Sequence, residues 1–290
     1  MLHNSVCAVV VTYCPSHDVA ENLAAICQQV QGLVVVDNGS PEETLAPIAA
    51  LQERLGFTLV RNGENRGIAN AMNVGLAHVL AESYRWVVFF DQDSRVTLGF
   101  VAALLTELQD PKVGIACPRY LDKESGGERP EMCVASDGGP LTCMTSGSMS
   151  PTDVFRKVGT FVEELFIYCV DDEMCLRVRS AGYTIRRSAT AVLVHKEGAS
   201  KFRSVGGRKF YVTDQKPNRR YYITRNQLWV RAKYPRYFPQ QTTKIRNLAL
   251  LVKGYARTLL LEGRRLAKAV AIGRGICDFM IGRMGKTIEL

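Results

Sequence analysis

Over about the first hundred residues, two kinds of segment alternate, and they differ in how their apolar and polar positions are spaced. Short continuous apolar runs, rich in β-branched and aromatic residues, have the composition of strands buried on both faces of a parallel sheet. Between these runs, apolar residues recur every three or four positions, which predicts helices. Strands are expected at residues 6–12, 33–36, 57–60 and 86–90, and helices at 18–30, from Pro41 with Ser40 as cap, and at about 68–82. The pattern predicts an α/β fold with a mostly parallel central sheet.

The remainder of the chain has a mixed pattern. Strands are predicted at residues 113–117, 142–149 and 183–194, and a helix at about 171–181. Residues 198–216, rich in glycine and basic residues, resemble a mobile loop. From Asn218 the pattern is helical again. Over residues 244–271 the apolar positions have helical spacing, at Ile245, Leu248, Val252, Tyr255, Leu259, Leu266 and Val270.

Charge is distributed unevenly along the 290 residues. Residues 201–290 hold 21 of the 37 Lys and Arg residues but only 4 of the 28 Asp and Glu residues. The basic side chains that flank the C-terminal apolar positions are Lys253, Arg257, Arg264, Arg265 and Lys268. Such a basic amphipathic helix can lie on an anionic membrane surface, which we favour, or pack on the catalytic domain.

Several classes of protein are disfavoured by composition. With 290 residues and 47% hydrophobic content, the chain is expected to fold as one large domain or as one domain plus an appendage. No apolar run approaches the length of a spanning helix, and the first residues lack the features of a signal peptide, so we expect a cytoplasmic protein. The nine cysteines contain no Cys-x-x-Cys pair and are expected to be reduced and mostly buried.

Two carboxylates, Asp91 and Asp93, follow the apolar run at residues 86–90. If the backbone stays extended, both side chains point to one side and Gln92 points to the other. Their mutual repulsion is removed by a cation between them, and oxygen ligands suit Mg²⁺ or Mn²⁺ with substrate phosphates completing the coordination. The alternative is a polar loop that merely begins after a strand.

Asp37 ends the second predicted strand, where a dinucleotide-binding fold places its ribose-binding acid. The turn after the first strand, Thr12-Tyr13-Cys14-Pro15, has no Gly-x-Gly-x-x-Gly, and no P-loop is present. The ligand crevice expected at the carboxyl ends of the strands therefore lacks the usual phosphate-binding loops. This implies that a metal binds and neutralises the diphosphate of a nucleotide.

Four segments, TYCP, VVDNGS, NRGIANAMNVG and FFDQDS, occur in this order. Over about residues 5–235 the chain resembles family 2 glycosyltransferases of the GT-A fold, most closely the bacterial rhamnosyltransferase branch. The resemblance implies a GT-A catalytic domain at 1–237, with a nucleotide-sugar half at about 1–97 and an acceptor half at about 98–237. A basic amphipathic helical tail at 238–290 would follow.

The resemblance also implies donor and metal residues. Asp37 would contact the base or ribose, and the Thr12-Tyr13 turn would line the base pocket. Asp93 matches the metal-binding Asp, and His195 matches a His that completes the ligation in several relatives, although a lone His is often structural. The residues expected around the donor are Thr12, Tyr13, Asp37, Asn65, Arg66, Asp91 and Gln92, and those expected at the metal are Asp93, Asp91 and His195. For Asn73 a structural role and a ligand contact are equally expected.

Three acids begin the helix predicted at residues 171–181. A helix dipole favours acids at this end whatever the function. Alignment with the family's Glu-Asp-x-Asp-x-x-x-Arg pattern puts Asp171 at the catalytic base, which would deprotonate the acceptor hydroxyl in an inverting transfer, and Glu173 at the following acid in the acceptor region. Asp172 is the rival base.

Three further residues match the branch. Ser146 and Gly147 belong to a small-residue stretch near donor and acceptor, with a tight strand end as the alternative. Arg225 could neutralise the leaving diphosphate, whereas most charges of its helix are expected to be solvated.

The leading hypothesis is a metal-dependent inverting transfer of rhamnose from dTDP-L-rhamnose to a polyprenyl-diphosphate-linked glycan, in O-antigen type lipopolysaccharide synthesis. The enzyme would be peripheral on the inner face of the cytoplasmic membrane, and a homo-oligomer is compatible with this role. UDP-hexose or UDP-galactofuranose is the alternative donor. A nucleic-acid-binding protein that uses its basic C-terminal part is the alternative of another class, but no recognised binding pattern supports a nucleic-acid partner.

Overall fold

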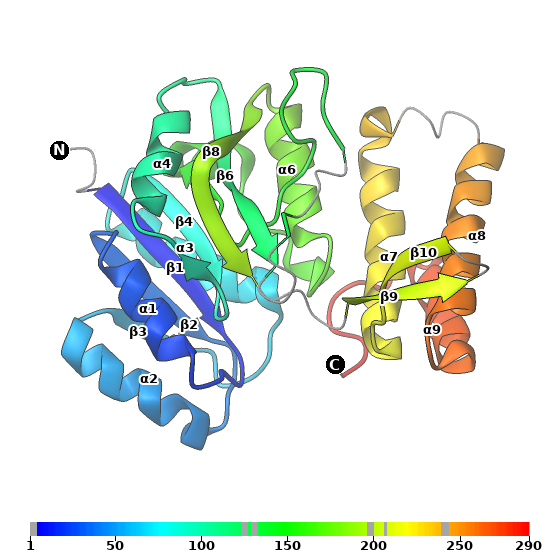
Figure 1. Ribbon diagram of the computed structural model, residues 1–290, viewed down its shortest axis with the longest axis horizontal. Coiled ribbons are helices and arrows are strands. Elements are labelled where there is room, and N and C mark those ends of the chain that lie inside the picture. The colour runs from blue at the N-terminus through cyan, green and yellow to red at the C-terminus, as the bar shows by residue number, and fades with distance from the viewer. Residues whose placement is uncertain are drawn as a thin grey trace. The chain divides into compact units, whose positions relative to one another are not determined.

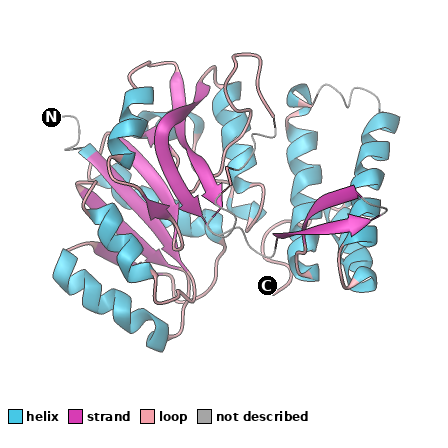
Figure 2. Ribbon diagram, in the orientation of Figure 1, coloured by secondary structure: helices cyan, strands magenta, loops and turns pink. Residues whose placement is uncertain are grey.

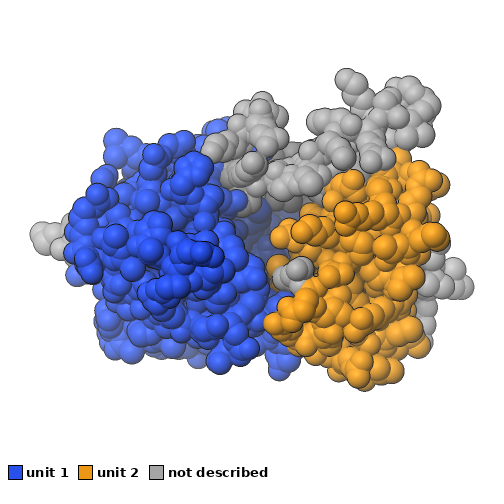
Figure 3. Space-filling model, turned by 90° about the horizontal axis from the view of Figure 1, so that it is seen from below, with its two compact units in different colours: residues 1–166, 170–196 blue, residues 167–169, 197–290 orange. Residues whose placement is uncertain are grey.

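A computed structural model describes residues 5–122, 127–128, 133–195, 200–205, 208–238 and 244–289. For residues 195, 200–205, 208–213 and 244–252 it describes the backbone only. The chain forms two compact units, residues 1–166 with 170–196 and residues 167–169 with 197–290 (Figure 3). These units are defined by packing, so the division into a catalytic domain and a tail at residue 237 stays a prediction.

The first unit is built on an eight-stranded, mostly parallel sheet in the order β3-β2-β1-β4-β7-β6-β8-β5 (Figures 1 and 2). β7 runs antiparallel between β4 and β6, and β5 runs antiparallel to β8. The strands are β1 Val6–Thr12, β2 Gly32–Asp37, β3 Thr58–Arg61, β4 Trp86–Asp91, β5 Arg95–Val96, β6 Val113–Asp122, β7 Met149–Pro151 and β8 Thr184–His195.

Helices cover this sheet on both faces. They are α1 Val19–Cys27, α2 Glu42–Leu55, α3 Ile68–Ala81, α4 Phe100–Glu107, α5 Thr152–Val158, the 3₁₀ helix η2 Glu163–Leu165 and α6 Val170–Ser180. Successive residues of β1 pack on opposite faces: Val10 joins Leu23 and Leu104 in the core, whereas Val9 faces Gly75 of α3. Because both faces are covered, β1 is buried at every position, which explains its unbroken apolar sequence.

Most predicted elements of the first unit are confirmed to within a few residues. The strand predicted at 142–149 is wrong, because only Met149–Pro151 pairs as a strand and Gly147, with φ +80°, turns the preceding loop. Ser40 is not a helix cap either, since α2 begins at Glu42 after Pro41 and the Ser40 hydroxyl donates to Asp37. All nine cysteines are free, but only Cys7, Cys117, Cys169 and Cys175 are buried, so the expectation that most are buried is wrong.

The second unit contains a hairpin where a mobile loop was expected. β9 Ser200–Val205 pairs antiparallel with β10 Arg208–Thr213. The loop interpretation is therefore wrong for these residues. A signal was present in the sequence, because two runs with aromatic and β-branched residues separated by Gly-Gly predict a hairpin.

The helix predicted at 244–271 is two helices. The helices of the second unit are α7 Pro217–Lys233, the 3₁₀ helix η3 Pro235–Tyr237, α8 Lys244–Leu261 and α9 Arg265–Met280. The helices are separated at residues 262–264, where Arg264 has φ +53°, outside helical geometry, and buried Glu262 accepts hydrogen bonds from Arg220 at 2.6 Å and from Lys268 at 2.8 Å. Within the described ranges, no helix is both long and apolar enough to cross a membrane.

The close approach of α3 to β1 at Gly75 gives a test of this packing. A Cβ at residue 75 would lie 2.3 Å from Val9 Cγ1, so Gly75→Ala should lower the free energy of unfolding by about 1–3 kcal/mol in urea denaturation. Gly254→Ala on α8 is the control, because a Cβ there meets nothing within 4 Å and Ala favours a helix. Equal stability of the two variants would contradict the packing argument.

Candidate active site

Three parallel strands end together at one edge of the first unit's sheet. In the strand register Thr12 lies opposite Asp37, and Val11 lies opposite Asp91. β1, β2 and β4 therefore bring the Thr12-Tyr13 turn, the Asp37 loop and the Asp91 turn to the same edge (Figure 1). In open α/β sheets this carboxyl edge is where ligands bind.

Asp37 organises the loop that follows β2. Its side chain is only 1% exposed. Asp37 Oδ1 accepts a hydrogen bond from Thr12 Oγ1 at 3.1 Å, and Oδ2 accepts from the backbone N–H groups of Gly39 at 3.0 Å and Ser40 at 2.8 Å. Both carboxylate oxygens are therefore engaged within the protein. A contact of Asp37 with a base or ribose stays a prediction.

Asn38 links the β2 loop to the loop before α3. Its Oδ1 accepts hydrogen bonds from Asn62 Nδ2 and from the backbone N–H of Arg66, each at 3.1 Å. Asn38 Nδ2 donates to Asn65 Oδ1 at 3.1 Å, and that oxygen also accepts the N–H of Gly67 at 3.0 Å. Asn65 thus holds its own loop. Asn38 was not singled out from the sequence, because its partners lie far along the chain.

The side chain of Arg66 is available to a ligand. It is 55% exposed and lies 3.3 Å from Glu64 Oε1, an exposed pair of the kind that contributes little to stability. Of the two candidates in this loop, Arg66 can reach outward more readily than Asn65.

α3 is tied to the segment that leads toward Asp171. Gly67 has φ +90°, and a Cβ there would lie 2.5 Å from Phe166 Cδ2. Asn73 Nδ2 donates to the Phe161 carbonyl at 2.9 Å, and the Phe161 N–H donates back to Asn73 Oδ1 at 2.9 Å. Of the two roles considered for Asn73, these contacts support the structural one.

The residues after β4 form a turn. The Ser94 N–H donates to the Asp91 carbonyl at 3.1 Å, so the backbone is not extended beyond Asp91. The expectation that strand alternation orients Asp91, Gln92 and Asp93 is therefore wrong. Gln92 Oε1 accepts the Tyr13 N–H at 2.8 Å, which joins this turn to the end of β1.

Two more contacts hold the Asp91 turn from other elements. Asn22 Nδ2 on α1 donates to the Gln92 carbonyl at 3.0 Å. Ser146 Oγ accepts the Asp91 N–H at 3.1 Å and lies 2.6 Å from Ser94 Oγ. Asn22 and Ser94 were given no role from the sequence, because the partners that they contact lie far along the chain.

Ser146 and Gly147 fit closely against β4. The Gly147 N–H donates to the Phe89 carbonyl at 2.7 Å, and a Cβ at residue 147 would lie 2.9 Å from Pro118 Cγ. These contacts agree with a tightly packed structural segment, which is a loop before β7 and not the strand end given as the alternative. A role near the acceptor stays a prediction for both residues.

The donor atoms at this turn fit a hard divalent cation. Asp91 is partly buried and Asp93 is exposed, and their carboxylate oxygens suit Mg²⁺ or Mn²⁺, which commonly keep water and phosphate ligands. No group of three or more His, Cys, Asp and Glu residues that could hold a metal occurs in the part of the chain that the structure describes. His195 ends β8 opposite Asp122 of β6, and its side chain lies outside the described residues.

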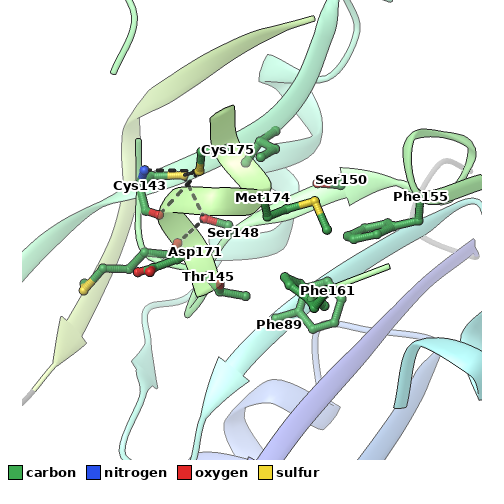
Figure 4. A pocket seen from close by; sticks show the side chains of 12 residues that line it. Phe89, Cys143, Thr145, Ser148, Ser150, Phe155, Phe161, Asp171, Met174 and Cys175 are labelled. Carbon is green, nitrogen blue, oxygen red and sulfur yellow. Dashed lines mark hydrogen bonds between the residues drawn. The ribbon is translucent and has the colours of Figure 1, made fainter. Parts of the chain in front are cut away.

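Asp171 borders a small, mostly apolar cavity of ≈ 20 Å³ (Figure 4). The cavity is lined by Phe89, Ile115, Cys143, Met144, Thr145, Ser148, Ser150, Phe155, Phe161, Asp171, Met174 and Cys175. Burial raises the pKa of Asp171 to about 8, and the neighbouring Asp172 carboxylate adds to this. A carboxylate with such a pKa is a stronger base than an exposed one.

The turn that leads into α6 has unusual backbone geometry. Phe166, Tyr168 and Cys169 have φ of +63°, +68° and +59°, a region that non-glycine residues rarely adopt. Within the second unit, Asn226 Nδ2 donates to the carbonyls of Ile167 at 2.8 Å and Tyr168 at 3.0 Å. A strained backbone persists where surrounding contacts hold it, and here the hydrogen bonds from Asn226 hold Ile167 and Tyr168. This fully buried residue was given no role from the sequence.

Two predicted site residues lie in buried ion-pair or hydrogen-bond networks. Glu173 is 0% exposed and pairs with Arg177 at 2.9 Å. Arg225 is also 0% exposed, and its Nη1 donates to the Gly285 carbonyl at 2.8 Å while its guanidinium lies 5.0 Å from the Tyr222 ring centre. These contacts support structural roles. An acceptor contact by Glu173 and a diphosphate contact by Arg225 stay predictions without support from the contacts.

Comparison with known proteins places these features in context. Residues 7–140 match the family model of Glycosyl transferase family 2. The chain is 30% identical over 243 residues to the dTDP-rhamnosyl transferase RfbF of Shigella flexneri, across 78% of this chain and 79% of that protein.

Two solved structures share the fold. The mannosyltransferase PcManGT from Pyrobaculum calidifontis, in complex with GDP-Man and Mn²⁺, has a TM-score of 0.62 at 18% identity, over 96% of this chain and 88% of that chain. S. aureus TarS 1-349 in complex with UDP-GlcNAc has a TM-score of 0.57 at 14% identity, over 94% and 71%.

The raised pKa of Asp171 predicts a pH-dependent effect on stability. Its pKa is about 8 when folded but near the ordinary carboxyl value when unfolded, so the folded state binds more protons and loses stability as pH rises from about 4 to about 8. Asp171→Asn removes this loss, so its gain in melting temperature over the native protein should be larger at pH 8 than at pH 5.

Asp153→Asn is the control for this measurement. The Asp153 side chain is 86% exposed, so its replacement should give no gain that grows with pH. An Asp171→Asn gain that is the same at pH 5 and pH 8 would show that burial does not act on this carboxyl group.

Proposed function

The chain belongs to glycosyl transferase family 2, in its rhamnosyltransferase branch, and on this premise we propose that it transfers L-rhamnose from dTDP-L-rhamnose to an acceptor hydroxyl. Its GT-A fold is shared with structures that hold nucleotide sugars. The observation that carries the proposal is the match to dTDP-rhamnosyl transferase RfbF. That match extends over 78% of this chain and 79% of that protein, well beyond the nucleotide-binding strands.

In this proposal the nucleotide binds at the carboxyl ends of β1, β2 and β4. Tyr13 is 47% exposed and directly follows the buried Thr12, so its ring can face a nucleobase. The hydrogen bond between the Tyr13 N–H and Gln92 Oε1 sets the distance between this turn and the Asp91 turn. Arg66 is the exposed cation of the same edge and is suited to a phosphate contact.

Asp91 and Asp93 would hold a divalent cation, with His195 as a third candidate ligand. When bound, Mg²⁺ or Mn²⁺ supplies charge neutralisation of the diphosphate leaving group. The protein's contribution is to orient the carboxylates. Ser146 and Asn22 do this by holding the backbone of the Asp91 turn through the contacts at 3.1 Å and 3.0 Å.

Asp171 is the proposed base. As the acceptor oxygen attacks the anomeric carbon, its proton passes to the Asp171 carboxylate, and the bond from that carbon to dTDP breaks on the opposite face. The transfer therefore inverts the anomeric configuration. Apolar walls formed by Phe89, Phe161 and Met174 limit water around this carboxylate, which strengthens its basicity.

We further propose a polyprenyl-diphosphate-linked glycan as acceptor, at the inner face of the cytoplasmic membrane, in O-antigen type lipopolysaccharide synthesis. Support comes from the C-terminal charge, since residues 201–290 hold 21 Lys and Arg residues against 4 Asp and Glu residues. Such a surface favours phosphate-rich lipid surroundings.

Another donor sugar is the second candidate. PcManGT in complex with GDP-Man and TarS in complex with UDP-GlcNAc share the fold, so the fold itself does not select the sugar. A UDP-hexose or UDP-galactofuranose donor would leave the roles of Asp93 and Asp171 unchanged.

A donor screen tests the proposal. The purified protein is incubated with dTDP-L-rhamnose, UDP-galactose, UDP-galactofuranose, UDP-GlcNAc or GDP-mannose, with Mn²⁺, Mg²⁺ or a chelator, and release of the nucleoside diphosphate is measured. We expect dTDP release from dTDP-L-rhamnose that requires the metal. Asp93→Ala should lower it by at least about 100-fold because a carboxylate ligand is lost.

Two results would decide against parts of this proposal. Preference for another nucleotide sugar would replace the donor but keep the enzyme class. Full activity of Asp93→Ala, or in chelator, would refute the metal role. Asp153→Ala, which removes an exposed carboxylate outside the proposed site, should retain activity, and thermal melting checks that each variant is folded.

The pH profile separates Asp171 from Asp172 as base. Asp171→Asn should lower transfer by about 100-fold or more at every pH, since general base catalysis contributes at least that much. Asp172→Asn removes a charge that raises the pKa of Asp171, so its activity should persist and its rise with pH should move to lower pH than in the native enzyme. Loss of activity in Asp172→Asn with activity retained in Asp171→Asn would reverse the assignment.

A further inference from the structure

α9 presents an apolar face to solvent. Leu266 is 85% exposed, Val270 is 72% exposed and Met280 is 75% exposed. Gly273 and Cys277, which lie between them in sequence, are exposed as well. Spacings of four, three, four and three residues put these five positions on one side of a helix. We call this surface the α9 face.

The opposite side of α9 is fixed against α7. Lys268 is 1% exposed and Ile272 is 6% exposed. A Cβ at Gly275 would lie 2.8 Å from the Tyr221 carbonyl oxygen, and Tyr221 Oη donates to buried Asp278 at 2.6 Å. α9 therefore cannot rotate to bury its apolar face without breaking these contacts.

The apolar positions expected to form one continuous face are divided between two helices. On α8, Leu259 is partly buried, and its neighbours Thr258 and Leu261 are 8% and 7% exposed. Leu266 and Val270, on α9, are exposed. Each helix buries one side and exposes another, since Leu260 on α8 is 67% exposed and Ile272 on α9 is 6% exposed. Membrane binding and packing on the catalytic domain, the two alternatives given for this stretch, both stay predictions.

The charges around the α9 face are basic. Arg264, Arg265 and Arg283 are exposed, and the Arg274 side chain is 49% exposed. Of the acids in and around α9, Glu262 and Asp278 are only 4% and 5% exposed, whereas Glu289 is exposed and pairs with Lys286 at 3.1 Å. Cations that flank an apolar stripe complement anionic headgroups above acyl chains.

This charge also argues against a second copy of the chain as occupant of the face. Two identical faces in contact would bring Arg264, Arg265 and Arg283 of both copies together, and like charges across an interface disfavour association. A lipid surface supplies the missing negative charge.

We propose that the α9 face binds the surface of an anionic phospholipid bilayer, with Leu266, Val270 and Met280 inserted among the acyl chains. The proposal deepens the membrane location given above by naming the surface responsible. It needs none of the proposed catalytic residues, so it can fail while the proposed activity holds.

Vesicle co-sedimentation of the full chain tests the proposal. Vesicles of phosphatidylglycerol and phosphatidylcholine are compared with vesicles of phosphatidylcholine alone, at matched salt. The native protein should sediment with the anionic vesicles and not with the neutral ones. Leu266→Glu/Val270→Glu should lower the apparent affinity by at least about tenfold, because two charges replace apolar contacts.

Leu98→Glu, a single apolar-to-acid change, is the control. Leu98 is 99% exposed but lies in the first unit, so this change should leave vesicle binding intact. Melting temperature and donor hydrolysis without vesicles verify that the double variant is folded and active. Hydrolysis that is absent in every form of the protein would instead point to failure of the proposed catalytic function.

Three results would overturn the inference. These are binding of the double variant equal to that of the native protein, no binding of the native protein to anionic vesicles, and a native dimer in light scattering that the double variant abolishes. The last result would assign the face to a second copy of the chain.

Discussion

The parallel register of β1 with β2 and β4 is the constraint on which the candidate site depends. It sets Thr12 beside Asp37 and Val11 beside Asp91. A slip of one residue would turn every side chain of a strand to the other face, and the turns after these strands would no longer meet. Thr12 and Asp37 are themselves buried, at 0% and 1% exposure, and a slip would break their hydrogen bond at 3.1 Å.

Neutral side chains hold the turns at this edge in place. Asn38, Gln92 and Ser146 each bind a backbone N–H of a neighbouring turn, at 3.1, 2.8 and 3.1 Å. In the proposed mechanism the carboxylates of the loop after β4 hold a cation, and a site that is ordered before the ligand arrives stabilises charge more effectively.

Asp171 depends on a different kind of environment. Apolar side chains around its cavity and the Asp172 carboxylate disfavour its ionised form and raise its pKa to about 8. The same burial lowers the free energy of unfolding when Asp171 is ionised and makes its carboxylate a stronger base, a combination common at active sites. The preceding turn at Phe166, Tyr168 and Cys169 has a left-handed backbone that other residues have to hold.

Most strands and helices around the carboxyl edge of β1, β2 and β4, the order of the motifs and the family follow from the sequence, because hydrophobic period and turn residues are local properties of the chain. What each polar residue contacts follows only from the tertiary structure. The burial of Arg225 and the anchoring of the Asp91 turn by Asn22 both depend on partners distant in sequence. For the same reason the exposed side of α9 could not be told from a packed one: its period is visible in the sequence, but only the contacts of Gly275 and Asp278 with Tyr221 show which side turns inward.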